Sequence, residues 1–115
     1  MRRLLLLGLL LTGMARTATY SEAQRLQIWK ALDAAEVRAM KGAEVAYPIS
    51  CIPAGQPEPS NATLRSNAEM NQNLRDKYEG AVIRKYKVTD RQIGALLIEA
   101  EKKHWPQISY RPPGC

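Results

Sequence analysis

Proline placement is the sequence feature that most limits what this chain can fold into. The chain has seven prolines, and none of them precedes residue 48 or lies between residues 60 and 105. Four lie between residues 47 and 60, where Gly55 adds further conformational freedom. Because each proline removes a backbone donor and fixes φ, this density excludes a regular element there. The sequence therefore predicts an extended connection at 47–60 between stretches that are free to be helical.

The stretch before this connection predicts a long helix from Ser21 to about Val45. Ser21 and Gln24 have the spacing of a capping box, in which each side chain bonds the other residue's backbone N–H. Gly42 lies inside the pattern and predicts fraying or an early end. At 100° per residue one broad arc is apolar. That arc comprises Ile28, Trp29, Leu32, Ala35, Ala39, Met40 and Ala43.

A second helix is expected from Asn61 or Ser66 to Tyr86. Its apolar residues fall on one stripe, and Gly80 weakens it slightly. The stripe comprises Leu64, Met70, Leu74, Tyr78, Ala81 and Val82.

The start of a third helix carries the strongest local signal in the chain. Thr89 and Gln92 match a capping box, and Val88 and Ile93 match the hydrophobic staple around it. Pro106 should end the helix. The residues expected to face the core are Ile93, Leu96, Leu97 and Ala100, while Glu99 and Lys103 are spaced for an ion pair.

These patterns together predict an all-α fold: one small three-helix domain with a proline-rich loop and an irregular carboxy-terminal tail. No alternating run long enough for a strand is present. With 45% hydrophobic and 24% charged residues, the composition is that of a folding chain.

The amino-terminal residues predict an export signal. Arg2 and Arg3 precede a leucine-rich run from residue 4 to 14, the arrangement of a signal peptide. As a helix this run is roughly 16 Å long, too short for the ~30 Å core of a membrane. We expect residues 1–15 to be removed, leaving one domain over 16–115, secreted or periplasmic and without a membrane span. A later cleavage after Ala23 and a buried amino-terminal helix are the alternatives.

The two cysteines, Cys51 and Cys115, predict one disulfide if the chain is exported. The bond would close a loop of about 65 residues, for which chain entropy predicts roughly 4 kcal/mol of stabilisation. Free thiols or a bridge between two chains are the alternatives. Two cysteines and His104, the chain's single histidine, do not have the spacing of a zinc site.

Two groups of residues are candidates for a catalytic site. His104 has an ordinary pKa near neutrality, but no nucleophile and orienting carboxylate can be identified around it. A histidine in the last turn of a helix is also favoured by the helix dipole alone. Asp33 and Glu36 lie one turn apart, as paired carboxylates of a hydrolase might. Two acids on an amphipathic helix are nevertheless common, so we expect no catalytic residue and no bound metal.

A cluster of basic residues near the start of the third helix forms the candidate binding site. It comprises Arg84, Lys85, Lys87 and Arg91. The same stretch is similar in pattern to the turn and second helix of a DNA-binding helix-turn-helix, but an exported chain meets no operator, so no nucleic acid is expected. The full chain has a formal net charge of +6. Loss of Arg2 and Arg3 leaves fifteen basic against eleven acidic residues, an excess that favours anionic partners.

The function expected from the sequence is that of an exported, non-enzymatic binding protein without a cofactor, contacting an unidentified protein or an anionic partner. The first alternative is a small extracellular hydrolase or metal-dependent enzyme in which His104 meets a carboxylate. The second is a cationic, membrane-active or toxin-like factor.

Overall fold

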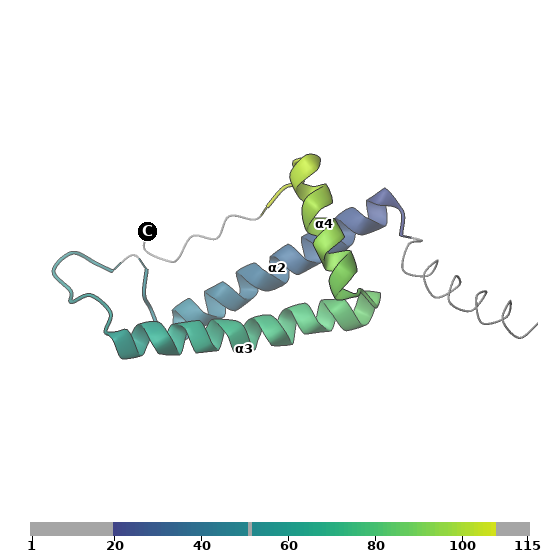
Figure 1. The fold of residues 1–115 in the computed structure, drawn as a ribbon. Coiled ribbons are helices and arrows are strands. Elements are labelled where there is room, and N and C mark those ends of the chain that lie inside the picture. Colours follow the sequence, from purple (N-terminus) through teal and green to yellow (C-terminus); the bar gives the residue numbers. More distant parts are fainter. Residues whose placement is uncertain (1–19, 51, 108–115) are drawn as a thin grey trace, which may run out of the picture.

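The computed structural model describes residues 20–50 and 52–107, which form three helices: α2 (Glu22–Ala46), α3 (Asn61–Tyr86) and α4 (Asp90–Lys102). The described residues contain no strand, and the predicted all-α class is confirmed. Helices α2 and α3 pack along one another, and α4 crosses the hairpin at the end where α2 begins (Figure 1). The predicted signal peptide and both cysteines lie outside the described residues.

Helix α2 begins as predicted but does not end early. The Ser21 hydroxyl accepts from the Gln24 N–H at 3.2 Å, and the Gln24 side chain accepts from the Ser21 N–H at 2.8 Å. The prediction that Gly42 frays the helix is wrong, because α2 continues to Ala46. A Cβ at Gly42 would lie 2.6 Å from Cδ1 of Leu74. The missing side chain of Gly42 therefore allows α3 to pack close to α2.

The contact between α2 and α3 is built from small residues. Ala35, Ala39 and Ala43 are buried at four-residue spacing on α2, so they share one face of the helix. The buried residue of α3 is polar: Asn67, whose amide nitrogen donates to the Tyr47 carbonyl at 2.9 Å. Small side chains let the two backbones lie close together, but they bury little apolar area per residue.

A buried carboxylate secures the start of the connection between α2 and α3. Glu44 accepts hydrogen bonds from the backbone N–H groups of Ile49 and Ser50, at 3.1 and 2.9 Å. These bonds satisfy its charge inside the protein. The described residues of the connection, 47–50 and 52–60, contain neither helix nor strand.

The corner between α3 and α4 is defined by backbone geometry. Lys87 is left-handed, with φ 52° and ψ 47°, and the next N–H, that of Val88, donates to the Ile83 carbonyl at 3.1 Å. The predicted capping box follows at once: the Gln92 N–H donates to the Thr89 hydroxyl at 3.2 Å, and the Thr89 N–H donates to the Gln92 side chain at 2.9 Å. The predicted start of this helix is confirmed.

The apolar core lies where α4 meets the hairpin. Ile28, Val88 and Leu96 form its buried centre. The apolar stripe predicted for α3 includes Leu64 and Ala81, but both residues are exposed and are not part of the core. Leu97, predicted to face inward, is 53% exposed, so the apolar arc of α4 is narrower than the sequence indicates. Around the centre are the partly buried Tyr20, Leu32, Tyr86, Ile93 and Trp105.

Helix α4 ends at Lys102, and three residues separate this end from Pro106. His104 adopts φ 53°, and the Trp105 N–H donates to the Ala100 carbonyl at 2.9 Å. This is the pattern of a Schellman motif, in which a left-handed residue stops the helix and the next residue packs back on it. The indole nitrogen of Trp29 then donates to the Pro106 carbonyl at 3.2 Å and fixes the exit of the chain.

Candidate functional site

The predicted basic cluster lies at the corner between α3 and α4, and we call it the basic corner. Its four residues fall within the stretch from residue 84 to residue 91, and all four are exposed. They comprise Arg84 and Lys85 in the last turn of α3, Lys87 in the turn, and Arg91 in the first turn of α4.

The cations of the basic corner have no acidic partner among the residues that the structure describes. Lys85 lies 5.3 Å from the centre of the Tyr86 ring, a cation–π contact that leaves its charge in place. Asp90, the acid of the first turn of α4, forms no ion pair with them. The corner is therefore a local concentration of positive charge that no neighbouring carboxylate neutralises.

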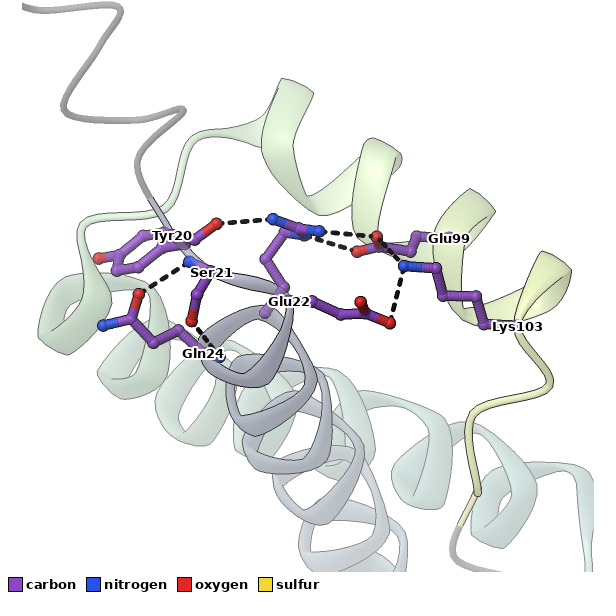
Figure 2. A network of polar contacts seen from close by, with 7 residues as sticks. Tyr20, Ser21, Glu22, Gln24, Glu99 and Lys103 are labelled. Carbon is purple, nitrogen blue, oxygen red and sulfur yellow. Dashed lines mark hydrogen bonds and ion pairs between the residues drawn. The ribbon is translucent and has the colours of Figure 1, made fainter.

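The ion pairs of this end of the molecule lie instead between α2 and α4 (Figure 2). The Arg25 guanidinium donates to both carboxylate oxygens of Glu99, at 2.8 and 3.0 Å, and to the Tyr20 carbonyl at 2.6 Å. Lys103 bridges Glu99 and Glu22, each at 2.9 Å. The Arg25 hydrogen bonds, followed by that of Lys103, lower the pKa of Glu99 from 4.5 to about 2. This network holds α4 against the start of α2 and thereby fixes the basic corner in place.

A cleft of about 420 Å³ runs between the three helices. The predicted carboxylate pair, Asp33 and Glu36, lies in its wall, but a cation is present there too. An Arg75 nitrogen lies 3.9 Å from a Glu36 carboxylate oxygen, and its Nε lies 3.7 Å from Glu79. Burial raises the pKa of Glu79. The apolar part of the wall comprises Trp29, Leu32, Val37, Met40, Ile83, Ile93 and Leu97.

His104 does not join these carboxylates. It lies in a separate shallow hollow beside Trp105 and Glu101, whereas Asp33 and Glu36 line the cleft. Its exposed side chain forms no hydrogen bond or ion pair with a described residue. Its conformation is explained by its place in the turn after α4. Within the described ranges no three His, Cys, Asp or Glu residues are grouped as metal ligands.

Two features of the site were not found by sequence reasoning. Arg25 and Glu99 are 74 residues apart, and Arg75 faces Glu36 from another helix. No local spacing rule connects such residues, because their contact exists only after the helices pack. The disulfide predicted between Cys51 and Cys115 lies outside the described residues.

Comparison of the chain with protein-family models, with curated proteins and with solved structures found no match. None of the helices within the described ranges is long and apolar enough to cross a membrane.

Proposed function

We propose that this chain is an exported binding protein, secreted or periplasmic, whose basic corner contacts an acidic surface of another protein. One observation carries the proposal: four neighbouring exposed cations, with no acidic partner among the described residues. Arg25, Arg75 and Lys103 differ from them, because each lies in an ion pair with a carboxylate. Unpaired like charges repel one another, and an anionic partner removes that repulsion.

The surroundings of the corner favour a protein partner over a lipid bilayer. Ile98, which is exposed, lies two turns beyond Arg91 on the same side of α4. A single apolar residue beside cations is typical of a protein interface, whereas membrane-surface binding needs a continuous apolar face. Leu97, the exposed neighbour of Ile98, lies on a different side of α4 from Arg91, and the exposed Val45, Tyr47 and Leu64 belong to the opposite end of the hairpin.

Export forms part of the proposal, on the evidence of the basic and leucine-rich segment over residues 1–15. In an oxidising compartment Cys51 and Cys115 would form the predicted disulfide. Amino-terminal sequencing and non-reducing intact mass of material from that compartment test both points. A chain that retains Met1, or that carries two free thiols, would contradict this part of the proposal.

Binding is tested with poly-L-glutamate as a model acidic chain, by titration calorimetry at an ionic strength of about 0.15 M, where the screening length is about 8 Å. Replacing the four cations of the basic corner by Gln should weaken binding at least ~10-fold, equivalent to about 1.4 kcal/mol. The matched control replaces four exposed cations elsewhere, Lys30, Lys41, Arg65 and Lys102, and should weaken it less than about 2-fold, because distant charges are screened.

Equal losses in the two variants would show that net charge alone attracts the polymer, and would contradict the proposal. Tight binding to vesicles of anionic lipid that survives 1 M salt, where the screening length is about 3 Å, would favour the membrane-active alternative instead.

A further inference from the structure

A pocket of about 320 Å³ lies between the start of α2 and the face of α4 that follows the basic corner. Ile28, Val88 and Leu96, the buried centre of the core, all line it, so the pocket reaches the apolar interior. Its volume falls in the range of roughly 300–1,000 Å³ that is usual for ligand sites. We call it the apolar pocket, and its wall comprises Tyr20, Arg25, Ile28, Val88, Gln92, Ala95, Leu96 and Glu99.

The charged part of this wall is fixed before any ligand enters. The Arg25 guanidinium donates to both oxygens of Glu99 and to the Tyr20 carbonyl (Figure 2), and the Tyr20 hydroxyl donates to the Tyr86 carbonyl. Lys103 joins the network by pairing with Glu99 and with the neighbouring carboxylate of α2. The network of two cations and two carboxylates has no net charge, and a fixed wall loses little entropy on binding.

The apolar pocket adjoins the basic corner along two stretches of chain. Val88 follows Lys87 directly, and Ala95 follows Arg91 by one turn of α4. Residues four positions apart on a helix are surface neighbours, with about 5–6 Å between their Cβ atoms. Arg91 therefore flanks the pocket at Ala95, and the pocket opens beside cations.

Asp90 is the acid that lies within the basic corner along the chain. Its neighbours three and four positions further on α4 are Ile93 and Gly94, and neither residue lines the pocket. Asp90 offsets one of the four cations, so an excess of three positive charges remains at the corner. The ligand that matches both features is an anionic chain that carries a large apolar group.

We propose that the acidic partner of the basic corner inserts one aromatic side chain into the apolar pocket, while its carboxylates contact Lys87 and Arg91. This inference rests on the function proposed above, and it specifies the segment recognised: an acidic stretch interrupted by an aromatic residue. Side chains that fill a pocket and exclude water carry much of the binding energy at protein interfaces. Ile98, exposed one turn beyond Ala95 on the same side of α4, extends the apolar surface.

The test compares two peptides of equal charge. Each has three Glu residues on either side of a central position, which is Phe in one peptide and Ala in the other. By titration calorimetry at about 0.15 M ionic strength, the Phe peptide should bind at least ~10-fold more tightly, equivalent to about 1.4 kcal/mol. In methyl-labelled protein, the Phe ring should shift the NMR signals of Ile28, Val88 and Leu96, and the Ala peptide should not.

Two variants show whether the preference for Phe depends on the pocket. Ala95→Phe adds an aromatic ring to the pocket wall and should reduce the preference to less than about 2-fold, because the ring competes for the same space. Ala81→Phe is the matched control. Ala81 is exposed, lies three positions before Arg84 on α3 and does not line the pocket. This variant adds the same ring beside the corner and should keep the full preference.

Equal affinity for the two peptides would remove the aromatic contact and leave the acidic partner standing. Methyl signals that do not move, or equal preferences in the two variants, would overturn the pocket as the site. So would the same methyl shifts on concentrating the protein alone, since a second copy of the chain would then fill it. Unchanged affinity for the Phe peptide after replacement of the four cations by Gln would retain the pocket and contradict the proposed function. No binding of either peptide would contradict both.

Discussion

At the amino end of α2, Ile28 packs in a core with Val88 and Leu96, whereas at its carboxyl end the contacts with α3 are made by alanines and by polar groups such as Asn67. Burial of large apolar side chains stabilises a fold far more than burial of methyl groups. The end that carries the basic corner is therefore held by the core itself. The hairpin end depends on backbone proximity and on hydrogen bonds to Glu44.

The largest expected effect is truncation of the core at the α4 end. Ile28 is 1% exposed, and Ile28→Ala should lower the free energy of unfolding by about 2–5 kcal/mol, as is usual for fully buried large-to-small changes. Leu74→Ala, on the half-buried face of α3, should cost less than half as much. Urea denaturation of both variants measures the difference. Equal losses of unfolding free energy would mean that the two ends of the molecule contribute equally to stability.

The hairpin end should instead be sensitive to added volume. Ala39 is fully buried between α2 and α3, and Ala39→Leu should destabilise by about 1–3 kcal/mol because the helices cannot approach as closely. Ala95→Leu, at an exposed position of α4, is the control and should change stability by less than about 0.5 kcal/mol. If Ala39→Leu left the free energy of unfolding unchanged, the contact between α2 and α3 would be loose and not close-packed.

The ion-pair network predicts a specific pH dependence. Because folding lowers the pKa of Glu99 from 4.5 to about 2, its contribution is fully present above pH 4.5 and is lost as the pH falls toward 2. Glu99→Gln should therefore be less stable than the unaltered protein at neutral pH and nearly equal to it at pH 2. Thermal melts across this range measure the convergence, with Glu58→Gln, an exposed residue of the connection, as the control. A difference in stability between the two proteins that stays constant with pH would contradict the role of Glu99.

The smallest effect concerns the turn inside the basic corner. Lys87 has φ 52°, a conformation that glycine adopts without a Cβ penalty. Lys87→Gly should raise the free energy of unfolding by about 0.5–1 kcal/mol. Lys87→Ala removes the same charge but keeps the Cβ, and should not stabilise. If both variants behaved alike, the effect would come from charge and not from the backbone.

Local rules predicted the helices well, because caps depend on residues three positions apart. Both capping boxes, at Ser21 and Thr89, are present. The helix ends were harder to predict, since the left-handed positions are occupied by Lys87 and His104 and not by the glycine that usually marks such a stop. Gly42 was misread for the opposite reason: its role depends on Leu74, from another helix.

The basic corner could be identified from the sequence because its members are close along the chain. The cleft could not, since its wall combines residues from three helices, and the role of Arg75 there depends on packing. Apolar periodicity also overstated the core. Leu97 and Leu64 fit their stripes but are exposed, because α4 crosses only one end of the hairpin (Figure 1).

The claim that the end of the molecule held by the core is also its binding end is tested most directly by NMR titration of the labelled protein with poly-L-glutamate. We expect amide shifts concentrated at residues 84–91. They should be reversed by 1 M salt, where the screening length is about 3 Å, and lost when the four cations of the basic corner are replaced by Gln. Shifts centred on the hairpin end, at residues 44–64, or unchanged in that variant, would contradict it.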